Sequence, residues 1–380
     1  MKTILILAFS NLKHDARVLR QLDFLAKKYA VTIACFDAVE SNDYTILRIK
    51  KTNLTLSRKL ASAFFLLTRF YSMAYRLLND YAYVKTKLAN QKFDLVIAND
   101  IESLPLAFEF KGAKVLFDAH EYAPRHFEDK LSWRIFFQGY NKFLCKKLIP
   151  LTSAMTTVGE GLSKEYAKHY PVKPIVVTNA SQYFDVPVQP LQENKIRLIH
   201  HGGANHSRKL ELMIKMMDYL DERFTLDMML ITPPIANTKT KSYINELERL
   251  IKDPNRIKIL PPKKPQEIVP FINNYDMGVF LLPPINFNYE NTLPNKLFDF
   301  IQARLAIAIG PTPEMARIVN DHDLGIVSDD FTPHSLAKKL NQLTSADLVK
   351  FKNNAAKVAH ELSAEQNKKI MLDIVDKLTS

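Results

Sequence analysis

Short apolar runs alternate along the chain with longer segments in which apolar residues recur every three or four positions. The runs are rich in β-branched residues, as in parallel strands that are covered on both faces. They predict strands at 3–9, 30–36, 44–49, 93–99, 114–118, 154–158, 196–201, 226–231, 256–260, 277–282 and 305–309. The periodic segments predict covering helices, as at 18–26, and the last 60 residues or so are helical in pattern.

A connection at about 169–195 interrupts this alternation with four prolines and no helical period. Such connections commonly separate domains, and 380 residues exceed the size of one growing core. We therefore predict an α/β fold with two doubly wound parallel sheets, in domains 1–175 and 176–362, with a helix at about 363–380 that packs back on the first. Ligands of such sheets bind at the carboxyl ends of the strands, so the cleft between the domains is the expected site.

The charge balance favours an anionic partner. The chain has 52 Lys and Arg against 40 Asp and Glu, a net charge of +12, but the basic residues are too dispersed for a nucleic-acid stripe. Cys35 and Cys145 have no CxxC partner, which indicates packed thiols in a reducing compartment. The apolar start lacks a cleavage pattern, and no apolar run approaches the roughly 20 residues that span a bilayer. We therefore expect a cytoplasmic protein. The sequence contains no P-loop and no GxGxxG motif, so neither of these nucleotide-binding motifs is indicated.

Two glycines and a basic pair follow the strand predicted at 196–201. Gly202 and Gly203 let the backbone approach a ligand, and Arg208 and Lys209 fall in the predicted first turn of a helix. Basic side chains are unfavourable there unless an anion is bound, so the segment predicts a phosphate site. A glycine turn with two solvated charges is the alternative. The neighbouring histidines lack a carboxylate at regular spacing, so we expect no metal.

A second basic helix start follows the strand predicted at 277–282. Pro294 suits the first helical position, Asn295 and Lys296 fall in the first turn, and Asp299 lies on the same side. A lysine for phosphate and a carboxylate for a sugar hydroxyl would fit a nucleotide or a nucleotide sugar. The alternative is an ordinary helix whose Asp299 pairs with a neighbouring lysine.

Polar side chains also gather after three predicted strands of the first domain. The clearest is His120, which follows the strand at 114–118 and could bind a substrate hydroxyl or stabilise developing charge, although a lone histidine is more often structural. The other candidate site residues in these groups are Asn11, Asp15, Arg17, Asp100 and Glu121.

Residues 56–78 are helical in pattern, basic and rich in aromatic residues. Such a helix can lie on an anionic membrane surface, and 143–148 would extend that surface. A helix that covers the core and turns a basic face to solvent explains the pattern equally well.

Taken in order, these segments resemble the family-4 glycosyltransferases of the GT-B fold. The resemblance covers nearly the whole chain and rests on NLKHDARVLRQLDFLAK, FDLVIANDIESLPLA, VLFDAHEY, TTVGEGL, VVTNA, HHGGANHSRKLE and ENTLPNKLFDFIQARLAIAI. It implies two Rossmann-like domains, a nucleotide-sugar donor held mainly by the second, an acceptor held by the first, retention of anomeric configuration, and no metal or other cofactor.

Matched position by position, Arg208 and Lys209 correspond to the family's basic residues that bind the donor diphosphate. His120 corresponds to the histidine that reaches the donor sugar. The family's carboxylate pair falls on Asn291 and Asp299, so only the second is acidic, and the adjacent Glu290 is a candidate substitute for the first. The donor-binding residues implied in this way are Gly202, Gly203, Glu290, Asn291, Asn295, Lys296 and Asp299.

The resemblance thus implies a hexosyltransferase that moves a sugar from a nucleoside-diphosphate sugar to a glycan or lipid-linked acceptor. It implies that the second domain binds the donor and that the first binds the acceptor, through Asn11, Asp15, Arg17, Asp100 and Glu121. The expected setting is cell-surface polysaccharide or glycolipid synthesis, in the cytoplasm or peripherally on the inner face of the membrane. Two alternatives stay open: a nucleotide-sugar epimerase of the same fold, and a non-catalytic protein that binds sugars or anions.

Overall fold

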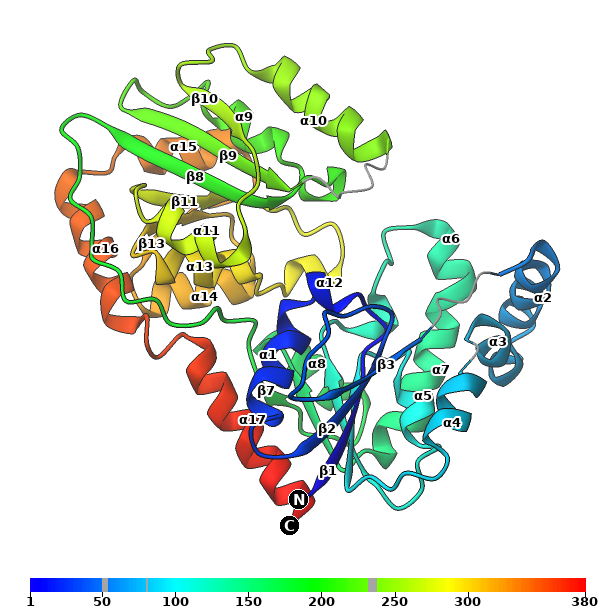
Figure 1. Ribbon diagram of the computed structural model, residues 1–380. Helices are drawn as coiled ribbons and strands as arrows, with labels where there is room; N and C mark the ends of the chain where they lie inside the picture. Colours follow the sequence, from blue (N-terminus) through cyan, green and yellow to red (C-terminus); the bar gives the residue numbers. More distant parts are fainter. Residues whose placement is uncertain (50–53, 80, 232–237) are drawn as a thin grey trace. The chain divides into compact units, whose positions relative to one another are not determined.

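The computed structural model describes residues 1–49, 54–79, 81–231 and 238–380 (Figure 1). The chain forms two compact units. Unit 1 comprises Met1–Thr178, Asn286–Asn288 and Lys368–Ser380, and unit 2 comprises Asn179–Ile285 and Tyr289–Asn367. The first change of unit lies inside the proline-rich connection, and the end of the C-terminal helix belongs to unit 1.

Unit 1 is built on seven parallel strands in the order β3-β2-β1-β4-β5-β6-β7. They are β1 (Thr3–Leu7), β2 (Ala30–Cys35), β3 (Thr45–Arg48), β4 (Leu95–Asn99), β5 (Lys114–Ala119), β6 (Ala154–Thr157) and β7 (Ile175–Val176). The strands predicted in this half are confirmed. The two-residue β7 was not predicted, because it is too short to stand out in the proline-rich connection.

Successive residues of the central strands enter two hydrophobic cores, because side chains alternate across a strand. Leu5 and Leu7 of β1 pack into one core, and Ile4 and Ile6 pack into the other. The second core also buries Met371 of the C-terminal helix. The helices are α1 (Ala16–Leu25), α2 (Leu56–Leu67), α3 (Tyr71–Leu78), α4 (Ala82–Leu88), α5 (Leu104–Ala107), α6 (Leu131–Trp133), α7 (Gly139–Leu148), α8 (Glu160–His169) and α17 (Ala364–Thr379).

Unit 2 repeats the plan with six parallel strands in the order β10-β9-β8-β11-β12-β13. They are β8 (Ile196–Gly203), β9 (Phe224–Ile231), β10 (Ile257–Leu260), β11 (Met277–Phe280), β12 (Ala306–Ile309) and β13 (Gly325–Val327). The remaining helices are α9 (Glu211–Met216), α10 (Thr238–Leu250), α11 (Pro265–Ile272), α12 (Phe287–Glu290), α13 (Asn295–Gln302), α14 (Pro313–Asp321), α15 (Pro333–Asn341) and α16 (Ser345–Val358). The predicted class, two doubly wound parallel sheets, is confirmed.

The basic aromatic segment differs from its prediction. Residues 56–78 form two helices, α2 and α3, that pack against each other rather than one continuous helix. Arg69 lies between them with φ of 63°, a left-handed conformation that no α-helix accommodates. Residues 143–148 belong to α7, where Leu144, Cys145 and Leu148 are buried in the core, so the apolar side of this segment faces inward. Within the described residues, no helix is both long and apolar enough to cross a membrane.

Candidate functional site

The end of β8 in unit 2 brings two basic side chains together. Gly202 has φ of 134°, which favours glycine. A Cβ atom placed on Gly202 would lie 3.2 Å from Lys296 Nζ and 3.4 Å from an Arg208 terminal nitrogen. Arg208 also donates a hydrogen bond of 3.1 Å to the Gly203 carbonyl. We call Arg208 and Lys296 the basic pair; they converge on partly exposed glycine backbone at the carboxyl end of a parallel strand.

Lys296 lies in an unusual environment for an ammonium group. Its side chain is 5% exposed, and Nζ lies 3.7 Å from the centroid of the Phe280 ring. His200 Nδ1 donates to the Val279 carbonyl, so His200 Nε2, 3.5 Å from Lys296 Nζ, is left as an acceptor. Burial and the nearby Arg208 hold the pKa of Lys296 well below its usual value. A bound anion would offset both the burial of the ammonium group and its repulsion by Arg208.

Asp299 lies one turn into α13 from Lys296, as the helical spacing predicted. The Ser181 hydroxyl is hydrogen-bonded to one carboxylate oxygen of Asp299. His201 Nε2 lies 3.4 Å from the other oxygen but completes no hydrogen bond there. Burial and then Lys296 and Arg208 lower the pKa of His201 to about 3, so the ring is neutral. The carboxylate of Asp299 is thus held in place beside the basic pair.

Lys209 differs in position from its prediction. Residues His206–Arg208 form a 3₁₀ turn, Lys209 follows with φ of 51°, and α9 begins only at Glu211. The expectation that Arg208 and Lys209 lie in the first helical turn is therefore wrong. Lys209 is exposed, with Nζ 3.9 Å from a Glu211 carboxylate oxygen, whereas Arg208 approaches Gly202 together with Lys296.

The other donor-side predictions concern the start of α13. Pro294 caps the helix with an extended conformation, so Asn295, not Pro294, is the first helical residue. Asn295 and Glu290 are exposed, and Asn291 is partly exposed. Their predicted contacts with a donor stay predictions.

In unit 1, Asp118 at the end of β5 is the centre of a buried polar cluster. It is fully buried and receives two hydrogen bonds from Arg17, of 2.5 and 3.0 Å, one from Gln21 of 2.6 Å and one from Thr156 of 2.8 Å. Burial alone would raise the pKa of Asp118, but the Arg17 guanidinium and His120 lower it well below the usual range. We call these residues the Asp118 cluster.

His120 joins the Asp118 cluster to Asp100. Its Nδ1 lies 3.2 Å from Asp100 Oδ2, its backbone N–H donates to Asp100 Oδ1 at 3.0 Å, and its Nε2 lies 3.5 Å from Asp118 Oδ2. Asp100 itself has φ of 61°. Burial opposes protonation of His120, but the two carboxylates outweigh it and raise the pKa of His120 to about 10. The imidazole is therefore a cation at neutral pH and could offset negative charge on a ligand.

We expect His120→Gln to destabilise the protein most below neutral pH. A raised folded-state pKa contributes stability that is fully present below the ordinary histidine value and is lost as pH rises through about 10. Between pH 6 and 9.5, the difference in unfolding free energy between wild type and variant should shrink by about 4 kcal/mol. Denaturant titrations at both pH values measure it, with His334→Gln, at an exposed histidine of unit 2, as control. An unchanged difference would contradict a charged His120.

The remaining acceptor-side residues have structural partners. Asn11 caps a 3₁₀ turn, and Asp15 caps α1 and is hydrogen-bonded to Ser10. Glu121 lies 2.5 Å from His126 Nε2. None of these contacts tests their predicted role toward an acceptor. Ser181, Gln21 and Thr156 were not predicted, and His201 was considered only as a metal ligand.

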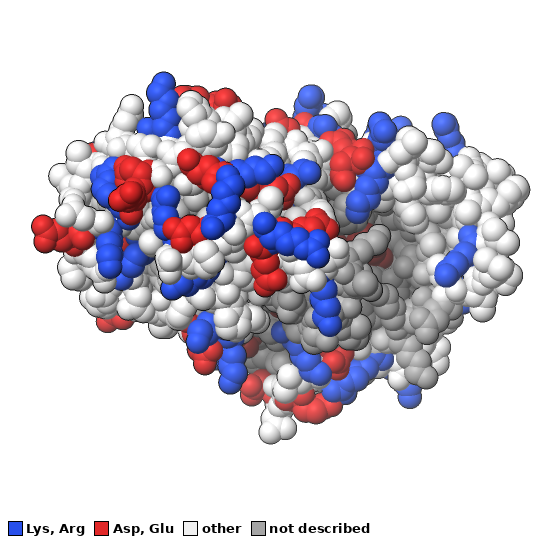
Figure 2. Space-filling model, turned by 90° about the horizontal axis from the view of Figure 1, so that it is seen from above, with Lys and Arg blue, Asp and Glu red and all other residues white. Residues whose placement is uncertain are grey.

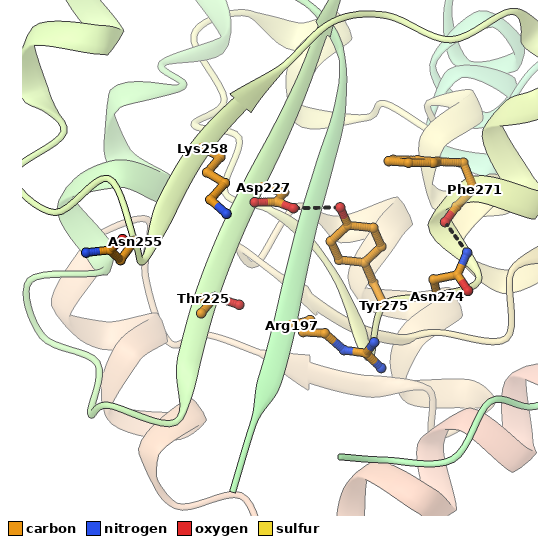
Figure 3. A pocket seen from close by; sticks show the side chains of 8 residues that line it. All are labelled: Arg197, Thr225, Asp227, Asn255, Lys258, Phe271, Asn274 and Tyr275. Carbon is orange, nitrogen blue, oxygen red and sulfur yellow. Dashed lines mark hydrogen bonds between the residues drawn. The ribbon is translucent and has the colours of Figure 1, made fainter. Parts of the chain in front are cut away.

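A pocket of about 320 Å³ lies elsewhere in unit 2 (Figure 3). Its lining comes from β8, β9, β10, the end of α11, and the segments before β10 and after α11: Arg197, Thr225, Asp227, Asn255, Lys258, Phe271, Asn274 and Tyr275. Arg197 and Thr225 lie near the amino ends of their strands, the opposite edge from the basic pair. Tyr275 donates to Asp227 at 2.6 Å, and Arg197 is paired with Asp276. The pocket is therefore separate from the predicted phosphate site.

The described residues contain no group of three or more His, Cys, Asp or Glu side chains arranged to hold a metal ion. Cys35 and Cys145 are both buried as free thiols, as predicted.

Solved structures share this architecture over the whole chain. HepE of Anabaena in complex with UDP is 12% identical, with a TM-score of 0.69, and the match covers 99% of this chain and 100% of that one. A glycosyltransferase from Rickettsia africae is 13% identical, with a TM-score of 0.70 and coverage of 99% and 98%. Sucrose-phosphate synthase from Thermosynechococcus elongatus is 10% identical, with a TM-score of 0.75 and coverage of 100% and 99%. These likenesses establish the GT-B fold.

No protein-family model and no curated protein sequence matches the chain.

Proposed function

We propose that the protein is a glycosyltransferase whose unit 2 binds a nucleoside-diphosphate sugar at the end of β8. The observation that carries the proposal is the basic pair, in which a buried lysine and an arginine meet over the backbone of Gly202. Two cations that repel each other in a buried site are stabilised when an anion binds between them and the backbone N–H groups. A diphosphate supplies such an anion.

Asp299 extends the proposed site toward the ribose. It lies one turn from Lys296 and is held by Ser181, and a carboxylate in this position suits a sugar hydroxyl. The similar HepE structure contains UDP, which agrees with a nucleoside diphosphate as the ligand class.

The finer assignments rest on the family resemblance. We propose transfer with retention, in the manner of family-4 enzymes, without a metal or other cofactor. The departing diphosphate would be stabilised by Arg208 with Lys296 or Lys209, and His120 would contact the donor sugar. The acceptor would be a glycan or lipid-linked glycan of cell-surface polysaccharide or glycolipid synthesis.

We expect at least one nucleoside diphosphate or its sugar to raise the melting temperature. At a hundredfold excess over Kd, a ligand that binds only the folded state stabilises it by about 2.7 kcal/mol. Thermal shifts with a panel of these compounds measure the effect, which Arg208→Ala and Asp299→Ala should weaken. Lys215→Ala, at an exposed lysine of α9, is the control. If no compound shifts the melting of a properly folded sample, donor binding at this site is wrong.

Release of nucleoside diphosphate then separates the remaining alternatives. A transferase releases it in proportion to added acceptor, an epimerase releases it without one, and a binding protein does not release it at all.

A further inference from the structure

Helix α2 of unit 1 turns an apolar stripe away from the protein. Leu56, Leu60, Phe64 and Leu67 recur at intervals of three or four residues, which places them on one face of the helix. They are 73%, 64%, 59% and 55% exposed, whereas Leu66 on the other side is buried in the core. Surface helices of globular proteins normally expose polar side chains on this face.

The stripe continues onto neighbouring segments. Phe70, in the turn after α2, is 62% exposed. The π-helical turn Arg134–Gln138 packs against α2, and its Ile135 is 52% exposed. Leu131, in the preceding α6, is 64% exposed. We call the exposed apolar side chains of α2, Phe70, Leu131 and Ile135 together the apolar surface. A continuous exposed patch of this kind marks an interaction site rather than ordinary surface.

The charged residues of the segments that carry the apolar surface are basic. Residues 54–79 and 130–148 contain no Asp or Glu. Their basic side chains include Lys59, Arg69, Arg76 and Arg134, all of which are exposed. In Figure 2 the surface of unit 1 at the right, where α2 and α6 lie, is mostly white with separate blue side chains. The partner must therefore offer an apolar phase beside negative charge.

We propose that the apolar surface docks unit 1 on a membrane that contains anionic lipids, with α2 lying in the plane of the headgroups. Leu60 and Phe64 would enter the acyl boundary while Lys59 and Arg76 meet lipid phosphates. A second copy of the chain fits less well, because a two-fold contact would press like charges together. The inference goes beyond the proposed function, since docking requires no donor and no transfer.

Flotation of the full chain with vesicles tests the inference without nucleotide. Wild type should float with vesicles of equal parts phosphatidylcholine and phosphatidylglycerol and should be released by salt, which screens the lipid charge. The double variant Leu60→Gln/Phe64→Gln should bind about tenfold less, because two apolar side chains would no longer enter the acyl boundary. Lys59→Gln/Arg76→Gln should also bind about tenfold less to these vesicles.

Val349→Gln is the matched control, since Val349 is 46% exposed on α16 of unit 2. It should float like wild type. All the substituted side chains are exposed, so circular dichroism should show folded variants. The inference is overturned if wild type does not float with the anionic vesicles, or if Leu60→Gln/Phe64→Gln floats as well as wild type. A dimer in solution that the same double variant dissolves would show instead that a second copy covers the surface.

Discussion

Lys296→Met is expected to lower turnover with a nucleotide-sugar donor by about 10² to 10³ while making the unliganded protein more stable. The loss of turnover follows from the proposed function, because a charged donor to the departing diphosphate acts when charge develops there. The gain in stability follows from geometry alone. Nζ is buried against Phe280 and Arg208, where a methionine side chain of similar length would pack without a charge.

The gain in stability should depend on pH and on bound ligand. The pKa of Lys296 is depressed in the folded state, so the unfolded chain binds more protons at neutral pH. The stability gain of Lys296→Met, about 1 kcal/mol at pH 7, should shrink as pH rises toward the ordinary lysine value. A bound diphosphate should reverse the order, because it stabilises only wild type strongly.

Steady-state kinetics and thermal unfolding with and without nucleotide measure these effects, with Lys215→Met as the exposed control on α9. Lys209→Met makes the comparison sharper. The resemblance assigns Lys209 to the diphosphate, but its Nζ lies beside Glu211 and Lys296 lies beside Arg208. We expect the larger loss from Lys296→Met. Equal turnover of wild type and Lys296→Met would contradict the basic pair as the diphosphate site.

The sequence predicted the sheets and the donor-binding candidates of unit 2, because the signals for both are local. Continuous apolar runs give buried parallel strands, and glycines and basic residues at strand ends predict anion contacts. Gly202, Arg208, Lys296 and Asp299 were all selected in this way, and the structure brings them together in unit 2. The strand order and the parallel register could only be expected from the fold class.

The missed features depend on contacts between distant parts of the chain. Ser181 lies in the proline-rich connection, 118 residues from the Asp299 that it binds. Gln21 looked like one polar residue of an amphipathic helix, yet it is buried on Asp118, 97 residues away. The break at Arg69 was missed because every residue of 56–78 tolerates a helix, and packing of α3 on α2 overrides that tendency.

Arg17→Met is expected to destabilise unit 1 by about 3 kcal/mol, because it leaves the carboxylate of Asp118 buried without its main counter-charge. Arg17 supplies two of the four hydrogen bonds to Asp118 and also donates to the Val177 carbonyl at 2.8 Å. His120 is the nearest remaining cation, at 3.5 Å, and Gln21 and Thr156 cannot neutralise the charge. Denaturant unfolding at pH 7 measures the loss.

A second substitution separates loss of the charge pair from loss of packing. If buried charge is the cause, Arg17→Met/Asp118→Asn should be more stable than Arg17→Met alone, because the amide keeps the shape of Asp118 without the charge. In wild type, Asp118 has a depressed pKa, so its contribution is present above the ordinary aspartate value and is lost only in strong acid. In Arg17→Met, burial should instead raise the pKa of Asp118. The loss of unfolding free energy relative to wild type should therefore shrink as pH falls from 7 to 5. A deficit that is independent of pH and unchanged by Asp118→Asn would show that Arg17 acts through packing and its bond to Val177.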